Sequence, residues 1–342
     1  MVGQSTKIDI VGPRKIWYAF SLLLIVVGMA FFFDRWAATG HPLNLGIDFT
    51  GGALTQFAFE RPFGTSADER VKVIEEARAL AAQLKVRASV EVEGENILTV
   101  HAPLTEEQNA PFSQQMEQAL EQHFGQKYGK AQIVAQDVVG PAIGAELKKK
   151  AVYALIAGIL FIILYISYRY DFKFAICAII ALVHDVLVIV GAMAISGMVV
   201  NSEFVAVILT VVGYSVNDTV VIFDRIRENV RLRKIDPFDR VVNDSLLQTM
   251  ARSVNTVLTV LLVLFFLFFM GGAPIHSFAF ALLVGITSGA YSSIFNASQI
   301  LVSWKGREVS VRQRVTGVRV AERMRKAAPS SSAAIPAAAT QS

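Results

Sequence analysis

The stretch "VVGYSVNDTVVIFDRIREN", residues 211–229, decides the class of fold to which this chain belongs. Its first half is apolar enough to lie in lipid, yet it carries Asn217 and Asp218 side by side, and it ends in a run of charged residues. An ionised carboxylate in hydrocarbon costs on the order of 3 kcal/mol on insertion scales. A carboxylate kept at that cost is expected to have a function, provided that the segment crosses a membrane.

Apolar segments of similar length recur along the chain. Of its 342 residues 54% are hydrophobic, and the mean hydropathy is positive, which disfavours an ordinary soluble enzyme. Because about 20 apolar residues cross a bilayer as a helix, the sequence predicts an α-helical membrane protein with six transmembrane helices. Their ranges are 16–33, 151–168, 174–196, 204–223, 253–270 and 277–304.

The first apolar run, 16–33, also has a feature of a secretory signal peptide, because basic residues precede it. A signal h-region is about 7–15 residues long, whereas this run is longer and ends in bulky residues. We therefore expect an uncleaved anchor, with cleavage after "AAT" (37–39) as the alternative. Cys177 is the single cysteine and no cysteine–histidine cluster occurs, so the sequence indicates neither an internal disulfide nor a metal site.

The segments between the apolar runs differ in their content of Lys and Arg. The basic ones are the N-terminus (1–15), the turn after 151–168, the connection 224–252 and the tail 305–342. The loops 195–203 and 270–276 contain neither residue. Since basic loops stay in the cytoplasm, both termini are expected to be cytoplasmic and the polar domain, 34–150, to lie outside. The lysines at 148–150 oppose this orientation, but long domains translocate largely regardless of charge.

The isoelectric point near 9.1 follows from this topology. The basic residues are expected to lie against anionic lipid, and no nucleic acid is expected as a partner. The connection 224–252 is predicted to form one or two amphipathic surface helices. The tail 305–342 ends in a low-complexity segment and is expected to be disordered.

The polar segment 34–150 has the pattern of an α+β domain. Strand-like and helix-like stretches follow one another in the order βαββαβ, which is that of a ferredoxin-like fold. Such a fold hosts many functions, so the order names none of them. His101 and His123 are isolated in the sequence, and surface or turn packing is their expected role.

Few polar side chains lie inside the predicted spans, so each is a candidate for function. Asp218 lies about 9 Å from the end of its span at Asp224, too deep for so short a side chain to reach water. Arg252 opens the fifth span, and its long side chain could reach a carboxylate on a neighbouring helix. The alternative for Arg252 is a basic anchor at the membrane surface. The polar residues beside these two are Tyr214, Asn217, Asn255 and Thr256.

The third span carries Asp185 about 18 Å beyond Lys173, near the predicted midplane. Asp185 is expected to face the bundle interior, and His184 to point to a different face, so that the two do not form a simple pair. Two aspartates in adjacent spans also suggest a second hypothesis, that of an intramembrane aspartyl protease. The two carboxylates are expected to be offset by about 9 Å, and no Gly-x-Gly-Asp signature precedes Asp218, so this reading is remote.

Proton relay is the role that remains. Burial disfavours the charged form of Asp218 and a nearby Arg252 favours it, so this carboxyl group could bind and release a proton during a cycle. A proton that crosses 100 mV carries about 2.3 kcal/mol, sufficient to bias an element with two states. On this hypothesis protonation of Asp218 releases Arg252, deprotonation recaptures it, and the helices that carry them shift.

Several motifs resemble the SecD/SecF family of the bacterial Sec protein-export machinery, and its SecF subunits in particular. These motifs are "LGIDFTGG" (45–52), "VGP" (139–141), "HD" (184–185), "GYSVNDTVVIFDRIREN" (213–229), "TMARSVNT" (249–256) and "GAYSSIFNAS" (289–298). The resemblance covers about residues 8–305. The family belongs to the resistance–nodulation–division (RND) superfamily, whose units have six spans with a large outer domain between the first two.

The resemblance implies a function that composition does not show. It implies a non-enzymatic accessory subunit of the Sec translocase, without a cofactor, in the bacterial inner membrane with its large domain in the periplasm. With SecD as the other half of the bundle, such a subunit uses the proton motive force to drive late steps of preprotein export. The SecYEG channel, YajC and unfolded preprotein are the further implied partners. The alternative is half of an RND-type exporter of small molecules or lipids.

The resemblance also assigns roles to residues. It implies that Asp218 and Arg252 couple proton movement to transport. It places Asp48, Gly51 and Gly52 where the first span joins the periplasmic domain. A flexible turn that transmits motion is expected at these two glycines, and simple chain reversal is the alternative.

Overall fold

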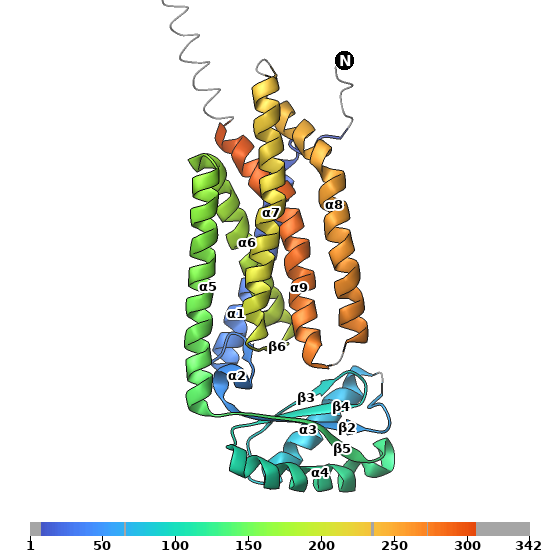
Figure 1. Cartoon of the computed structure of the whole chain (residues 1–342). Helices are drawn as coiled ribbons and strands as arrows, with labels where there is room; N and C mark the ends of the chain where they lie inside the picture. The colour runs from blue at the N-terminus through green and yellow to red at the C-terminus, as the bar shows by residue number, and fades with distance from the viewer. Residues whose placement is uncertain (1–7, 65, 234–235, 272, 306–342) are drawn as a thin grey trace, which may run out of the picture.

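The computed structural model describes residues 8–64, 66–233, 236–271 and 273–305. Long helices form a bundle, and an α+β domain lies beyond one end of it (Figure 1). The helices of the bundle are α1 (Arg14–Thr39), α5 (Pro141–Arg169), α6 (Phe172–Ser196), α7 (Glu203–Leu232), α8 (Phe238–Met270) and α9 (Ala273–Ser292), which continues through a π-helical turn η1 (Ser293–Ala297) to Lys305. By length and composition six described helices can cross a membrane, as the sequence predicts.

The helices extend beyond the predicted spans, and this corrects the prediction for the connection 224–252. Instead of separate surface helices, α7 continues to Leu232 and α8 begins at Phe238. The reason is that an apolar face continues past the first charged residues. Ile226 on α7 and Val242 on α8 are buried in the same core cluster as the bundle interior. Likewise α5 begins at Pro141, ahead of the apolar run at 151–168.

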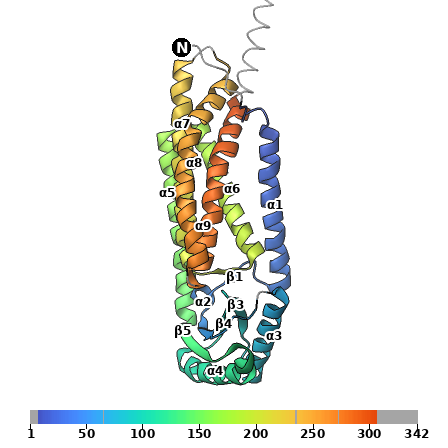
Figure 2. The ribbon, with the colours of Figure 1, turned by 90° about the vertical axis from the view of Figure 1, so that its right-hand side faces the viewer.

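The α+β domain has the predicted ferredoxin-like topology. Its elements are β2 (Gly52–Phe59), α3 (Ala67–Gln83), β3 (Ser89–Glu93), β4 (Ile97–Ala102), α4 (Glu106–Tyr128) and β5 (Ala131–Val139). The four strands form an antiparallel sheet in the order β3-β4-β2-β5. Both views place α4 on the side of the sheet away from the bundle (Figures 1 and 2), and α3 packs into the same apolar core as α4.

The two faces of this sheet differ in chemistry, because alternate strand residues point to opposite faces. Phe57 and Leu98 are fully buried in a cluster with residues of α3 and α4, which forms the apolar core of the domain. The other face turns toward the bundle (Figure 1) and is polar. On it Gln56 donates a hydrogen bond to Glu93 at 2.8 Å, and burial raises the pKa of Glu93.

Three short elements join the domain to the bundle. Strand β1 (Asn44–Leu45) pairs in parallel with β6 (Val199–Val200), which links the end of α1 to the loop before α7. Between β1 and β2 lies α2 (Ile47–Thr50), a single turn. The glycines that follow it have φ angles of +71° at Gly51 and +113° at Gly52, a region that L-residues rarely adopt.

The packing of the bundle depends on close contact between helices. Helices α6, α7 and α9 have about half of their most apolar segments buried, whereas α5 and α8 are largely exposed. Helix α1 packs against α6, and the two backbones come into close contact at Gly28 and Gly191. A Cβ atom on Gly28 would lie 2.8 Å from the Cα atom of Gly191, so neither helix has room for a side chain at this crossing.

We predict that Gly28→Ala destabilises the protein, because the added methyl group must push α1 away from α6. Overpacking of this kind costs about 1–3 kcal/mol. The measurement is the midpoint of thermal unfolding of the purified protein in detergent, and the expected result is a lower midpoint. Gly213→Ala is the matched control, since a Cβ atom there meets nothing within 4 Å. Equal midpoints for the two variants would contradict the prediction.

Candidate functional site

The carboxylate of Asp185 lies at the centre of a group of hydrogen-bond donors inside the bundle. Its side chain is fully buried on α6. Ser215 of α7 donates to Oδ2 at 2.7 Å, and Ser292 of α9 donates to the same oxygen at 2.8 Å. Ser288 of α9 donates to Oδ1 at 2.8 Å. Three helices are therefore joined through one carboxylate, as expected for an Asp185 that faces the interior.

The expectation that His184 and Asp185 do not pair is wrong. His184 Nδ1 lies 3.1 Å from Asp185 Oδ1, and both side chains are buried. Adjacent residues on a helix project in different directions, but the His184 ring turns back far enough to bring Nδ1 to the carboxylate. His184 Nε2, by contrast, is buried without a hydrogen-bond partner among the described residues.

These contacts place two polar groups on each oxygen of Asp185, and the four groups are three serine hydroxyls and the His184 ring nitrogen Nδ1. The three serine hydroxyls and the His184 ring hold Asp185 in one position between α6, α7 and α9. Ser215, Ser288 and Ser292 are not among the residues predicted from the sequence. Serine is common in membrane helices, and the only available signal was the recurrence of serine on faces of α7 and α9 that point inward.

A second polar contact lies one turn from this group. Thr219 of α7 and Ser293 are hydrogen-bonded through their hydroxyls at 2.8 Å, and Ser293 begins the π-helical turn η1. In the same turn Asn296 accepts a hydrogen bond from Ser21 of α1 at 2.8 Å. A π-helical turn inserts one residue into a helix and frequently occurs at functional sites. Here the turn places polar side chains of the last helix in contact with both α1 and α7.

Asp218 lies in different surroundings. Its side chain is partly buried on α7, and Ser253 of α8 donates a hydrogen bond to Oδ1. Oδ2 is buried without a hydrogen-bond partner among the described residues. One oxygen of this carboxyl group is thus satisfied by the protein and the other is not, which leaves a position open for a proton.

The structure does not form the expected contact between Arg252 and Asp218. Arg252 is exposed and makes no ion pair within 4 Å among the described residues, whereas Ser253, the next residue, points inward. The physical reason is helical phase, since successive residues on α8 are rotated by about 100°. Arg252 lies one position from the face of α8 that contacts α7, and its side chain points outward.

The remaining predicted polar residues lie along the same side of α7 and α8. The Tyr214 hydroxyl donates to the backbone oxygen of Thr256 at 3.3 Å, and the Thr256 hydroxyl donates to the Arg252 backbone oxygen at 2.8 Å. Asn217 and Asn255 are exposed and make no hydrogen bond within the described part of the chain. Polar groups on the outer surface of membrane helices require partners, so this surface is expected to be covered.

The two aspartates do not form a catalytic dyad. The hydrogen-bond partners of Asp185 come from α6, α7 and α9, whereas that of Asp218 comes from α8. No side chain is shared between the two carboxyl groups. An aspartyl protease needs two carboxylates that share one proton, so the protease alternative has no geometric support. Within the described residues no group of three or more acidic, histidine or cysteine side chains could hold a metal ion.

The structure brings together the predicted residues at the junction with the α+β domain. Asp48 accepts two hydrogen bonds from Ser202, one from its backbone N–H at 2.9 Å, at the start of α7. A Cβ atom on Gly51 would lie 2.9 Å from the Cα atom of Pro141, and one on Gly52 would lie 2.6 Å from a backbone oxygen. Glycine is therefore required at both positions, because the φ angles are positive and no space remains for a Cβ atom. These two requirements explain the reversal of the chain, and a movement of the domain is not needed to explain them.

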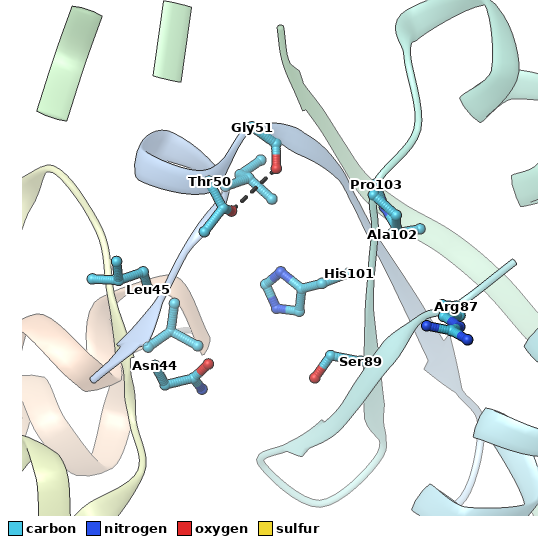
Figure 3. A pocket seen from close by; sticks show the side chains of 11 residues that line it. Asn44, Leu45, Thr50, Gly51, Arg87, Ser89, His101, Ala102 and Pro103 are labelled. Carbon is cyan, nitrogen blue, oxygen red and sulfur yellow. Dashed lines mark hydrogen bonds between the residues drawn. The ribbon is translucent and has the colours of Figure 1, made fainter. Parts of the chain in front are cut away.

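A cavity of about 300 Å³ lies at this junction (Figure 3). The ring of His101 projects into it between Thr50 and Ser89, and Arg87 lies at its edge. His101 Nε2 is buried without a partner in the described residues, and burial lowers the pKa of His101. His101 is therefore packed at this junction and not solvated, whereas His123 is exposed, as expected for a surface residue, and its Nε2 lies 3.1 Å from a carboxylate oxygen of Glu76.

Comparison with known protein families identifies two matching regions. Residues 104–307 match the family described as "Protein export membrane protein SecD/SecF, C-terminal". Residues 36–62, which include Gly51 and Gly52, match the SecD/SecF GG motif. The first match spans more than half of the chain and contains both aspartates and Arg252.

Known proteins similar to this chain carry the same family name. The protein translocase subunit SecF of Thermobaculum terrenum is 40% identical over 88% of this chain and 95% of its own length. The protein translocase subunit SecDF of Bacillus subtilis is 44% identical over 49% of this chain, which corresponds to 23% of that longer protein.

A solved structure shares the fold. The crystal structure of SecDF, a translocon-associated membrane protein from Thermus thermophilus, superposes with a TM-score of 0.72 at 33% sequence identity. The superposition covers 88% of this chain and 39% of SecDF, so the chain corresponds to less than half of that protein. The chain belongs to the SecD/SecF family of protein export membrane proteins.

Proposed function

We propose that this chain is the SecF-type half of a SecD–SecF complex, and that it couples proton entry at Asp218 to late steps of protein export. The observation that carries the proposal is the incomplete hydrogen bonding of Asp218. A buried carboxyl oxygen without a partner is costly, and proton binding removes the negative charge that makes it so. Polar and acidic groups at this depth default to a functional role.

The coupling step follows from the surroundings of Asp218. In its charged form the carboxylate attracts the Arg252 guanidinium, which lies on the neighbouring helix one residue from Ser253. In its neutral form the attraction ends and only the Ser253 hydrogen bond joins α7 to α8. The two protonation states therefore favour different separations of these helices. Asp185, which is held by polar side chains of α6, α7 and α9, provides the fixed core against which they move.

A SecD partner is supported by the relatives in which both halves form one protein, SecDF. The exposed surface of α7 and α8 with Asn217, Asn255 and Arg252 is where we place this second half. The SecYEG channel, YajC, an unfolded preprotein and anionic lipid are proposed as further partners. The names of the relatives favour protein export over the export of small molecules or lipids.

The proposal includes an orientation in the bacterial inner membrane. The Lys and Arg residues at and beyond the ends of α5, α7 and the last helix support cytoplasmic termini, and the α+β domain then lies in the periplasm. We propose that the chain is not an enzyme and that its energy source is the proton gradient. The Gly51–Gly52 turn is proposed to transmit motion to the α+β domain, although its conformation also fits a static reversal.

The main test is Asp218→Asn in the assembled complex reconstituted into vesicles. Asparagine keeps nearly the same shape but cannot bind the transported proton. We expect the stimulation of preprotein export by an imposed proton gradient to be lost, while export without the gradient stays unchanged. The matched control is Asp224→Asn, since this exposed carboxylate at the end of the span pairs with Arg169. Wild-type stimulation in Asp218→Asn would exclude Asp218 as the coupling acid.

A second test concerns the basic partner. Arg252→Lys keeps a positive charge but loses the planar guanidinium with its five donors. If the arginine acts by charge alone, gradient-stimulated export is retained, whereas Arg252→Ala abolishes it. Because Arg252 is exposed and unpaired in this structure, neither variant is expected to lower the unfolding midpoint. Full activity in Arg252→Ala would show that Asp218 works without this arginine.

A third test separates the two aspartates. Asp185→Asn places two N–H donors where two side chains now donate, so we expect the free energy of unfolding to fall by about 1–3 kcal/mol. Asp218→Asn is the same chemical change at a carboxyl group with one donor, and its effect on unfolding is expected to be small. The measurement is denaturant or thermal unfolding in detergent, and an inverted order of the two variants would contradict the assignment.

A further inference from the structure

A cavity of about 360 Å³ lies at the end of the bundle opposite the α+β domain, between α5 and α7. Its lining consists of Arg169, Asp224, Arg227, Glu228, Arg231 and Leu232. Nothing in the proton-coupling proposal uses these residues. Three guanidinium groups and two carboxylates line this cavity. A ligand can be bound only by those charges that are not already paired with each other or with a neighbouring residue.

The two carboxylates of the cavity are already paired. Arg169 donates to both oxygens of Asp224 at 3.3 and 3.2 Å, and Arg225 donates to Glu228 at 2.7 Å. Arg227 and Arg231 have no carboxylate within 4 Å among the described residues. The cavity therefore keeps two uncompensated positive charges.

The two free arginines are placed to act on one ligand. They are four residues apart on α7, so they project from the same face of the helix, about 6 Å apart along its axis. The guanidinium of Arg227 also lies over the ring of Tyr170, 5.5 Å from its centre, and this contact restricts the side chain. Guanidinium groups bind phosphate oxygens through paired N–H donors, so this arrangement suits a phosphate group.

Exposed apolar side chains indicate that the ligand also has an apolar part, since Leu232 belongs to the lining and Tyr168 and Phe172 lie one and three residues from its Arg169. Tyr168 is 94% exposed and Phe172 is 72% exposed at the turn between α5 and α6, and Leu232 in the cavity wall is 73% exposed. Arg227 and Arg231 lie about 5 and 11 Å beyond Asp224 along α7. A headgroup layer is about 5–8 Å thick on each side of the hydrocarbon, so Arg227 lies at the level of lipid phosphates, and the long side chain of Arg231 can reach back to that level from the next turn.

We propose that this cavity binds the phosphate group of an anionic phospholipid, with Arg227 and Arg231 as its ligands and the exposed aromatic residues against its acyl chains. The inference depends on the orientation of the helices in the membrane and not on proton coupling at Asp218. Lipid binding and gradient-stimulated export are measured separately, so failure of one leaves the other standing.

The experiment uses the purified full-length chain in detergent, titrated with phosphatidylglycerol or with phosphatidylcholine, and native mass spectrometry counts the lipids retained. We expect one phosphatidylglycerol to be bound in preference to phosphatidylcholine. Arg227→Ala combined with Arg231→Ala is expected to weaken this binding about 30-fold, since each basic residue contributes about fivefold at an anionic surface. Arg231→Ala alone changes an exposed residue, so it is not expected to disturb folding, and it is expected to weaken binding about fivefold.

The matched control is Lys15→Ala combined with Arg240→Ala, which removes the same charge from exposed positions at the same end of the bundle. This control is expected to bind phosphatidylglycerol as the wild type does. Equal loss in both double variants, or equal binding of the two lipids, would overturn the proposal. Displacement of the lipid by an equal concentration of inorganic phosphate would assign the site to a free anion instead. A double variant that retains the lipid but no longer co-purifies with SecD would assign the arginines to a protein contact.

Discussion

The buried carboxylate of Asp185 is the constraint on which the arrangement of the bundle depends. A charge in this position cannot be solvated by water, so every donor it needs must come from the protein. Ser215, Ser288 and Ser292 reach it only if α6, α7 and α9 pack closely. Gly289 makes this possible, since a Cβ atom there would lie 3.0 Å from the Cβ atom of Ser215. The serine hydrogen bonds to Asp185 thus depend on the close packing of α7 and α9 at Gly289, and the same hydrogen bonds hold these helices together.

Asp218 shows what happens when the same residue type lies at the edge of such a bundle. It has one hydrogen-bond partner where Asp185 has four, and the neighbouring polar residues Asn217 and Asn255 face outward. A fully satisfied carboxylate resists change in its surroundings, whereas a partly satisfied one responds to it. The chain therefore places a rigid acid in its core and a responsive acid beside the surface that another helical bundle is proposed to cover.

Hydropathy and residue pattern predicted much of this architecture. The six spans follow from apolar runs, and the order of strands and helices in the α+β domain follows from alternating and helical patterns. The helix ends were less predictable, since the buried stripe that includes Ile226 continues into a segment of many charges. The three serines were missed because a serine that satisfies a buried charge has no distinctive local pattern. The outward position of Arg252 depends on the rotation of α8, which the sequence does not fix.

Helix α5 connects the two parts of the molecule in a way that has a geometric consequence. It is unbroken from Pro141 to Arg169, a length of about 43 Å, and only Gly140 separates it from the edge strand β5. A rod of that length that leans by about 10° moves its far end by about 7 Å. A small change of inclination within the lipid would therefore displace the whole sheet by more than the spacing between two of its strands.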